Sequence, residues 1–470
     1  MKFTVYVTLQ TVTGYLLSNN NEYQVYLTTG DQSKKLSREA ALTPTNQESG
    51  YNLWVDRRKR RQTIEGFGGA LTNSAAYAIY NSPVRSQVIR DLFGQGENEL
   101  GITYLRIVMG GSDFNAVPTY TYDDMGPGQT DFDMNHFSIQ ADKAFFIPVI
   151  KEALSVYPNL KILATPWSAP GWMKTSHGLN GGEFINDGRY MQAYALYFAK
   201  FIEAYRSEGI QIESVSCQNE PLLSRDDYPT MKMSADVQKA FIRDHLGPLF
   251  RQRNINTKIL VFDHNWSDPW YPESVVNDDN VKQYISGVAW HGYGGRHDEP
   301  GTFHNSHPDV GNYFTEITGG DWDTNFASGL TWDNRIITIG QTKNWAKAVF
   351  FFNIALDQNH GPRVSGLGGC GDCRGIVTVP SGSHSFTKNV EYYALGHLSK
   401  FVKPGAVRLE TNNFGWDDLH AVAFSNTDGT TVVVAANPNG SKQATFSINI
   451  DAQHYVYYNL PPNSVATFIK

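Results

Sequence analysis

Residues 214–221 read Ser-Val-Ser-Cys-Gln-Asn-Glu-Pro, a short run that ends in the polar triplet Asn219-Glu220-Pro221. The first five residues are typical of the end of a buried strand. Taken alone, the triplet favours a helix start, with Asn219 as the N-cap and Pro221 at the first helical position. The triplet also presents a carboxylate beside an amide at a strand end, and the surrounding sequence has to decide between these interpretations.

Apolar, strand-like runs alternate with helical patterns through the middle of the chain. The strand candidates are residues 62–67, 104–108, 161–165, 214–218, 258–262, 287–291, 313–317 and 348–353, and helical patterns include 142–157, 188–207, 234–252 and 332–347. This alternation predicts parallel strands joined by crossover helices. Eight strands favour a closed α/β barrel, a (β/α)₈ TIM barrel, over an open sheet, and the chain lacks the Gly-rich turn of a dinucleotide site.

Both ends of the chain have a different pattern, with short β-rich runs between Asn, Gly and Pro residues. Residues 5–9 alternate, residues 23–29 resemble an edge strand, and 431–436, 444–448 and 464–468 are further strand candidates. We therefore predict a side β-sandwich domain formed by residues 1–61 and 404–470, with residues 62–403 forming the barrel.

A second glutamate, Glu316, ends another strand candidate in the sequence Asn-Tyr-Phe-Thr-Glu-Ile of residues 312–317. Counted along the barrel, Glu220 ends the fourth strand and Glu316 the seventh, so the two carboxylates are expected to face each other across the mouth. Two such groups are what hydrolysis of a sugar acetal needs. Retention of configuration requires about 5–5.5 Å between them and inversion about 6.5–9.5 Å, which sequence does not measure.

Other polar residues stand at predicted strand ends. Arg106 lies in an otherwise apolar run, which favours an ion pair or a site role over a surface position. Asp113 follows a glycine turn at the predicted rim, where it could accept hydrogen bonds from sugar hydroxyls or simply cap an Asx-turn. Trp167 stands between prolines after a strand and is predicted to wall a sugar subsite, whereas Trp172 is assigned to the core.

His291, followed by Tyr293, ends the sixth strand candidate. We expect His291 to donate a hydrogen bond to substrate or to Glu316, and Tyr293 to help keep Glu316 ionised. A metal role for His291 is not expected, because Cys, His or Asp residues at ligand spacing are missing around it. No cofactor is predicted.

The composition excludes several classes of partner. The 470 residues carry a formal net charge of −7, which argues against nucleic acid, and the basic run of residues 57–61 is interpreted as a solvated turn between two strands. No segment approaches the roughly 20 apolar residues of a membrane span. The first residues make a poor secretory signal, so three interpretations stay open: an export signal that is not evident in this sequence, a mis-assigned start, or a cytosolic protein. We expect a monomer.

The three cysteines cannot form a disulfide framework. Cys370 and Cys373 could close a small loop if the protein is exported, and Cys217 is interpreted as an inert core thiol.

The motifs in this order resemble glycoside hydrolase family 30, which contains glucosylceramidases and endo-β-1,6-glucanases. The resemblance begins with Gln-Thr-Ile-Glu-Gly-Phe-Gly-Gly-Ala-Leu-Thr-Asn-Ser-Ala-Ala at 62–76 and runs from about Trp54 to the C-terminus. The further matching segments are 105–107, 111–114, 120–122, 165–170, 219–221, 314–316 and 393–401.

The resemblance implies a (β/α)₈ barrel with a side sandwich, and a retaining mechanism. It also implies that Glu220 is the acid/base and Glu316 the nucleophile, and that the glycone subsite is lined by Arg106, Asp113, Trp167, Asn219, His291, Tyr293 and Phe352. Residues 263–266 and 289–295 resemble the microbial endo-β-1,6-glucanase branch. Phe352 stands where the glucosylceramidases of the family carry a tryptophan.

These features predict a secreted, retaining hydrolase of β-glucosidic bonds, with an endo-β-1,6-glucanase as the first choice. A glucosylceramidase-like β-glucosidase is the alternative, and a xylanase-type hydrolase or an inactive carbohydrate-binding protein comes third.

Overall fold

The computed structural model describes residues 22–46, 48–450 and 455–470. The strand expected within residues 5–9 lies outside these ranges. Of the helices in the described part of the chain, none combines the length and the apolar character needed to cross a membrane.

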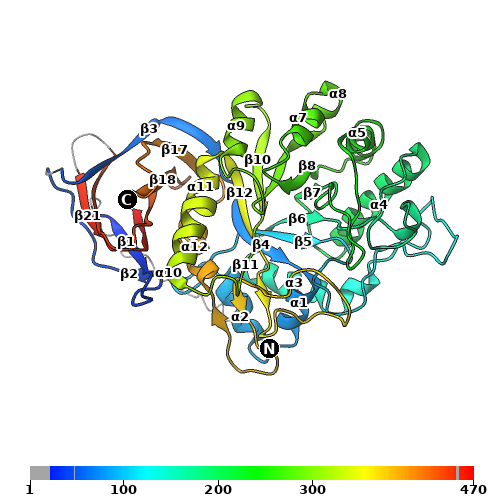
Figure 1. Ribbon diagram of the computed structural model, residues 1–470, viewed down its shortest axis with the longest axis horizontal. Helices are drawn as coiled ribbons and strands as arrows, with labels where there is room; N and C mark the ends of the chain where they lie inside the picture. Colours follow the sequence, from blue (N-terminus) through cyan, green and yellow to red (C-terminus); the bar gives the residue numbers. More distant parts are fainter. Residues whose placement is uncertain (1–21, 47, 451–454) are drawn as a thin grey trace, which may run out of the picture.

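Eight parallel strands close into the predicted barrel, which lies on the right in Figure 1. In sequence order they are β4 (Gly66–Leu71), β5 (Tyr104–Val108), β6 (Lys161–Thr165), β7 (Ser214–Ser216), β8 (Lys258–Asn265), β9 (Ile285–His291), β10 (Gly311–Glu316) and β12 (Ala346–Phe352). Each strand pairs with its sequence neighbours around the ring, and β12 closes it on β4.

Helices follow the strands and cover the outside of the barrel (Figure 1). They are α1 (Asn73–Tyr80), α2 (Arg85–Phe93), η1 (Gln140–Lys143), α3 (Phe146–Val156), η2 (Gly171–Met173), α4 (Gly188–Ser207), α5 (Ala235–Ala240), η3 (Phe241–Leu246), α6 (Gly247–Gln252), α7 (Trp270–Val276), α8 (Asp279–Lys282), α9 (Glu299–Ser306), α10 (Phe326–Trp332), η4 (Asp333–Thr338), α11 (Ile339–Lys343) and α12 (Val390–Ser399). Short strands β11 (Gly319–Gly320), β13 (Ala355–Leu356), β14 (Cys373–Arg374), β15 (Val377–Thr378) and β16 (Thr387–Lys388) lie in the loops that follow β10 and β12.

The first barrel strand was misplaced by the sequence pattern. Residues 62 and 63 end β3 (Tyr51–Thr63) of the side domain, and the barrel strand is β4, which begins at Gly66. The glycine-rich sequence of β4 does not look like a strand, although β4 is buried in the barrel. A Cβ at Gly68 would overlap the carbonyl oxygen of Tyr104, so this close packing requires glycine. The fourth strand is also shorter than expected, ending at Ser216.

The basic run at 57–61 is part of β3 and is not a turn, which corrects the sequence interpretation. The pairing of β3 with β17 (Val407–Thr411) slips between Asp56 and Arg60, so the basic side chains project from an irregular, exposed stretch of strand. Arg61 forms an ion pair with Glu410 at 2.8 Å, which anchors one end of the run.

The side domain is a nine-stranded sheet built from both described ends of the chain, on the left in Figure 1. Besides β3 and β17 it contains β1 (Gln24–Thr29), β2 (Ser37–Arg38), β18 (His420–Ser425), β19 (Thr431–Asn437), β20 (Ala444–Asn449), β21 (Tyr455–Leu460) and β22 (Ser464–Ile469). The ring of Phe446 on β20 meets that of Phe468 on β22 at 5.8 Å although these strands do not pair, so the sheet folds over a core as a sandwich. β1 is covered by β2 and is therefore not the edge.

A layer of side chains fills the barrel interior and fixes what lies above it. Its members include Tyr104, Ala289, Tyr313 and Phe350, and the rings of Tyr104 and Phe350 meet at 5.0 Å. Alternate residues of a strand share a face. The residues two positions further along these strands, such as Arg106 after Tyr104, therefore project into the barrel just below its mouth.

Candidate active site

Glu220 and Glu316 converge on one cavity at the C-terminal ends of the barrel strands. Glu220 follows β7 in a left-handed backbone conformation (φ 47°), and its amide donates to the Asp263 carbonyl at 2.9 Å. Glu316 is the last residue of β10. One carboxylate oxygen of each glutamate and one ring nitrogen of His291 all lie within 4.8 Å of one another. Carboxylate oxygens this close favour the roughly 5–5.5 Å spacing of retaining glycosidases over the about 6.5–9.5 Å that inversion needs.

Glu316 is held at both oxygens by side-chain donors, one of them fully buried. The Arg106 guanidinium donates to Oε2, and the Tyr293 hydroxyl donates to Oε1 at 3.0 Å. Hydrogen bonds to both oxygens fix the direction of the carboxylate. Tyr293, which the sequence analysis placed beside Glu316, donates to it here, and Arg106 is the second donor.

Arg106 is fully buried, so its charge has to be compensated inside the barrel. Besides Glu316, it donates to Asp263 Oδ2 at 3.0 Å and to Asn219 Oδ1 at 2.8 Å. Asn219 is thereby tied to the same network, which places its amide next to Glu220.

Asp263, at φ 66° on β8, is the centre of this network and was not predicted as a site residue. Its carboxylate also accepts from Ser216 Oγ at 2.6 Å and from Thr315 Oγ1 at 2.6 Å. Burial raises the pKa of Asp263, but the Arg106 charge and the hydrogen bond with His291 outweigh it and hold the pKa well below its usual range. A permanent negative charge therefore stands beneath the two glutamates.

His291 bridges this buried charge and Glu220. Its Nε2 lies 3.0 Å from Asp263 Oδ1 and its Nδ1 lies 3.1 Å from Glu220 Oε1. Burial lowers the pKa of the imidazole, but the Glu316 charge and the hydrogen bonds with Asp263 and Glu220 raise it to about 9. In turn, burial raises the pKa of Glu220, and the hydrogen bond from His291 turns the net shift downward. His291 therefore contacts Glu220 more closely than Glu316, the partner that the sequence suggested.

The Glu220, His291 and Glu316 trio has ligand atoms close enough to consider a metal ion. An imidazole with a pKa of about 9 is protonated at neutral pH, and both its nitrogens then donate. A protonated imidazole has no lone pair for a metal. The arrangement fits a shared proton better than a cation.

Asp113 lies at the rim of the same cavity. Burial, followed by the charges of Glu316 and Glu220, raises the pKa of Asp113 to about 8. Its buried Oδ1 has no hydrogen-bond partner among the described residues. A neutral carboxyl with an unused oxygen is suited to a sugar hydroxyl, which can donate and accept.

Trp167 and Phe352 form an aromatic layer beside the glutamates. Their rings stack at 6.0 Å, and the Arg106 guanidinium lies 4.9 Å from the Trp167 ring centre. Phe352 lines the cavity and Trp167 does not, although the two side chains are about equally buried. The ring that meets the cavity is therefore that of Phe352, and Trp167, which was expected to wall the subsite, packs against it. Trp172 is buried, as expected.

His264, on β8 next to Asp263, is a second residue that the sequence analysis left out of the site. Its Nε2 lies 3.8 Å from Glu220 Oε1, and the residue lines the cavity. Burial lowers the pKa of its imidazole. Asp263 and His264 follow a predicted strand, so the rule that located Arg106 and His291 also marks these two as polar residues at a strand end, although they were given no role in the site.

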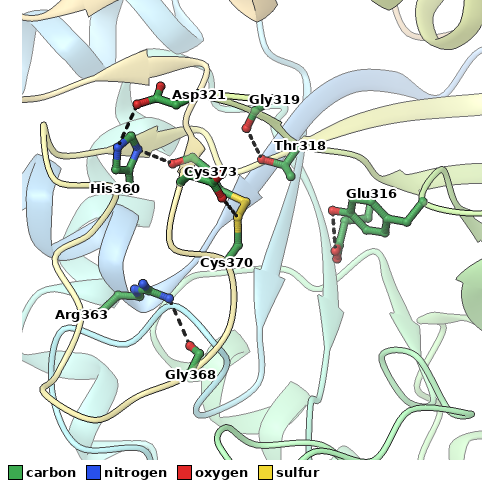
Figure 2. Close-up of a disulfide and its surroundings, with 11 residues drawn as sticks. Glu316, Thr318, Gly319, Asp321, His360, Arg363, Gly368, Cys370 and Cys373 are labelled. Atoms are coloured by element: carbon green, nitrogen blue, oxygen red, sulfur yellow. Dashed lines mark hydrogen bonds and ion pairs between the residues drawn. A yellow bond between two sulfur atoms is a disulfide. The ribbon is translucent and has the colours of Figure 1, made fainter. Parts of the chain in front are cut away.

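The cavity has a volume of about 860 Å³, and a disulfide-bonded loop forms part of its wall. Cys370 and Cys373 are joined by a disulfide, and Figure 2 shows this bridge on the loop that also carries Gly368. Arg363 donates to the Gly368 carbonyl at 3.1 Å and fixes the start of the loop. Gly369 packs so closely on Asp113 that a Cβ there would lie 2.8 Å from the aspartate Cβ. Cys217 is a buried free thiol.

Comparison with known proteins gives the same picture. The profile of the "Glycosyl hydrolase family 30 TIM-barrel domain" matches residues 64–402, and that of the "Glycosyl hydrolase family 30 beta sandwich domain" matches residues 405–468. The chain is 34% identical over 439 residues to the Endo-1,6-beta-D-glucanase of Neurospora crassa, which covers 89% of each protein. It is 31% identical to Putative glucosylceramidase 2 of Caenorhabditis elegans, over 94% of this chain and 88% of that protein.

Among solved structures, the endo-beta1,6-glucanase BT3312 is similar to this chain, with a TM-score of 0.86 and 31% identity. The match covers 96% of this chain and 99% of that one. Barrel, side sandwich and paired carboxylates together define a glycoside hydrolase. The chain belongs to glycoside hydrolase family 30.

Proposed function

We propose that the protein is a retaining endo-β-1,6-glucanase that cleaves a β-1,6-linked glucan by double displacement. The choice of a β-1,6-glucan as the substrate rests on the similarity, over about nine-tenths of the chain, to relatives named endo-1,6-β-glucanases. The 4.8 Å convergence of the carboxylates supports the retaining mechanism.

In the first step, Glu220 would protonate the glycosidic oxygen while Glu316 attacks the anomeric carbon, so the C–O bond to the leaving sugar breaks and a glucosyl ester forms. In the second step, Glu220 would take a proton from water, whose oxygen attacks the same carbon and releases Glu316. Arg106 and Tyr293 hold the Glu316 carboxylate and aim it at that carbon.

The proton for the first step is supplied by the Glu220–His291 pair in this proposal. The imidazolium holds a proton 3.1 Å from Glu220 Oε1 in the free enzyme. A bound sugar displaces water from the carboxylate, which makes the charged form of Glu220 less favourable and moves the shared proton onto it. Asp263 then stays ionised on the other side of the ring.

The second candidate is a glucosylceramidase-like β-glucosidase, because putative glucosylceramidases match at 31% identity over 94% of the chain. The deciding experiment incubates the protein with pustulan, laminarin, xylan and a glucosylceramide side by side, with Glu316→Gln as the inactive control. Release of oligosaccharides from pustulan supports the proposal. Release of glucose from glucosylceramide, with pustulan untouched, would replace it with the alternative.

We also propose that the protein acts outside the cell. The Cys370–Cys373 bridge supports an oxidising compartment, and a polymeric glucan is a substrate found there. Mass spectrometry of the protein from its native host, in culture fluid against cell extract, tests this.

A further inference from the structure

The cavity continues well beyond the two glutamates. Its far part is lined by Trp322, Asp323, Trp332, Asp333, Arg374 and Glu391. These residues come from the segment after β10, from α10 and η4, from β14 and from α12. The proposed mechanism uses none of these residues, so it does not account for this part of the cavity.

Two tryptophans give this part of the cavity flat apolar surface. Trp322 is 58% exposed and Trp332 is 39% exposed, which is unusual for so large a side chain. The Trp322 ring rests on the backbone of β11, because a Cβ on Gly320 would lie 2.0 Å from its Cζ3. Indole rings that are held in place and left open to solvent are typical of sites that stack a ligand.

Polar groups line the same cavity as the tryptophans. Arg374 pairs with Glu391 at 2.9 Å and donates to the carbonyls of Gly320 and Asp323, each at 2.9 Å. The positive charge of Arg374 is therefore balanced locally, and the β11–β14 pairing is fixed by it.

Asp333 lies beside this pair with an oxygen that the protein does not use. The residue is 6% exposed, and Oδ2 has no hydrogen-bond partner among the described residues. Burial, followed by the Glu391 charge, raises the pKa of Asp333 well above its usual range, which favours the neutral form of the carboxyl. A buried polar atom without a partner is unfavourable, and a hydrogen bond with a ligand hydroxyl would remove that cost.

We propose that these residues form a distal subsite for a neutral hexose unit of the glucan chain, separate from the site of cleavage. A flat apolar surface opposite a few convergent polar groups is the chemistry that recognises a sugar ring. The charge of Arg374 is balanced by Glu391, which leaves no free cation for a uronate and favours an uncharged sugar. The inference rests on the proposed function, because it assigns part of the same polymer to this surface.

The test compares kcat/KM for a β-1,6-linked glucose disaccharide and hexasaccharide in the wild-type protein and in Trp322→Ala. The variant is expected to lower the hexasaccharide-to-disaccharide ratio by about tenfold, because only the longer chain reaches the distal subsite. Trp270→Ala is the matched control, since Trp270 is 52% exposed on α7 and is not among the residues that line the cavity. It should keep the wild-type ratio.

A direct binding measurement accompanies the kinetics. Isothermal titration of the hexasaccharide into Glu316→Gln and into Glu316→Gln/Trp322→Ala should show about tenfold weaker binding in the double variant. An unchanged length ratio together with unchanged binding overturns the distal subsite, as does an equal loss on both substrates.

Failure of the proposed function gives a different result. If the wild-type protein cleaves only β-1,3- or β-1,4-linked chains, the proposed linkage is wrong. The distal subsite is then tested with the disaccharide and hexasaccharide of the linkage that is cleaved. A lower hexasaccharide-to-disaccharide ratio in Trp322→Ala supports the subsite, and an unchanged ratio overturns it. If no glucan is cleaved or bound, both proposals are overturned.

Discussion

Asp263 lies 3.0 Å from the Arg106 guanidinium, and both side chains are fully buried at the centre of the barrel mouth. Neither residue lines the cavity, yet both of the glutamates are oriented through them. Arg106 reaches Glu316 and Asn219, and Asp263 reaches Glu220 through His291. The catalytic geometry therefore depends on a buried ion pair that lies outside substrate contact.

Asp263→Asn should remove the charge that balances Arg106 and His291 while keeping the shape of the side chain. We expect the free energy of unfolding to fall by about 3–5 kcal/mol, since a buried arginine loses a partner. The pKa of His291 should fall as well, because Asp263 is one of the groups that raise it. Urea unfolding and an NMR titration of the His291 ring measure both.

Ser216→Ala is the matched control, because it removes one hydrogen bond to Asp263 and no charge. It should cost only about 1 kcal/mol and leave the His291 titration near its wild-type midpoint. Equal effects of the two variants would mean that the charge of Asp263 is not what matters.

Replacement of the two glutamates should have separable effects. Glu316→Ala should lower kcat by at least about 10⁴-fold and Glu220→Ala by about 10²–10⁴-fold on polymeric substrate, because the first loses the nucleophile and the second the acid. Added azide should restore turnover in both variants, with an α-glucosyl azide from Glu316→Ala and a β-glucosyl azide from Glu220→Ala. NMR of the products distinguishes the two anomers, and the same anomer from both would contradict the assigned roles.

Asp113→Asn should stabilise the protein at alkaline pH. Asp113 ordinarily has a pKa of 3.8 and is raised to about 8 in the folded protein. The folded state thus holds a proton that the unfolded chain releases between these values, so wild-type stability falls as pH rises from about 4 to 8. The variant carries no such charge. The difference in free energy of unfolding between variant and wild type should therefore be about 2–5 kcal/mol more in favour of the variant at pH 9 than at pH 4.

Unfolding in urea at both pH values, with wild type and variant in parallel, checks this. A pH-independent difference between the two proteins would show that Asp113 ionises normally. The variant should also bind glucan less tightly, because an amide replaces the carboxyl at the rim.

Loss of the Cys370–Cys373 bridge should change substrate binding more than stability. A loop this short contributes at most about 2 kcal/mol by constraining the unfolded chain. Gly369 packs directly on Asp113, however, so a looser loop should displace that carboxyl and raise KM while kcat changes little. Steady-state kinetics of Cys370→Ser/Cys373→Ser measure this, and Cys217→Ser, which touches a buried thiol outside the loop, is the control. An unchanged KM would show that the loop holds its place without the bridge.

Much of the fold followed from the sequence, because hydrophobic period and strand-helix alternation are local properties. The run 104–108 and the helix 188–207 have the bounds that the pattern predicted. The first strand was misplaced because the Gly-rich β4 has no apolar period, and its burial comes from neighbours such as Tyr104. The limits of the two domains at residues 61/62 and 403/404 stay a prediction, and so do the roles of the individual site residues.

The sequence alone determined that Glu220 and Glu316 lie at the C-terminal side of two strands of one barrel, since polar residues after an apolar run mark the strand end. Only the tertiary structure decided what surrounds them. Asp263 became the centre of the site because Arg106, Ser216, His291 and Thr315 reach it from four other strands. Contacts between strands far apart in the chain depend on the register of the strands and on closure of the barrel, and no local sequence pattern predicts either. The tertiary structure also packed Trp167 against Phe352 and placed Trp322 and Trp332 in the lining of the cavity.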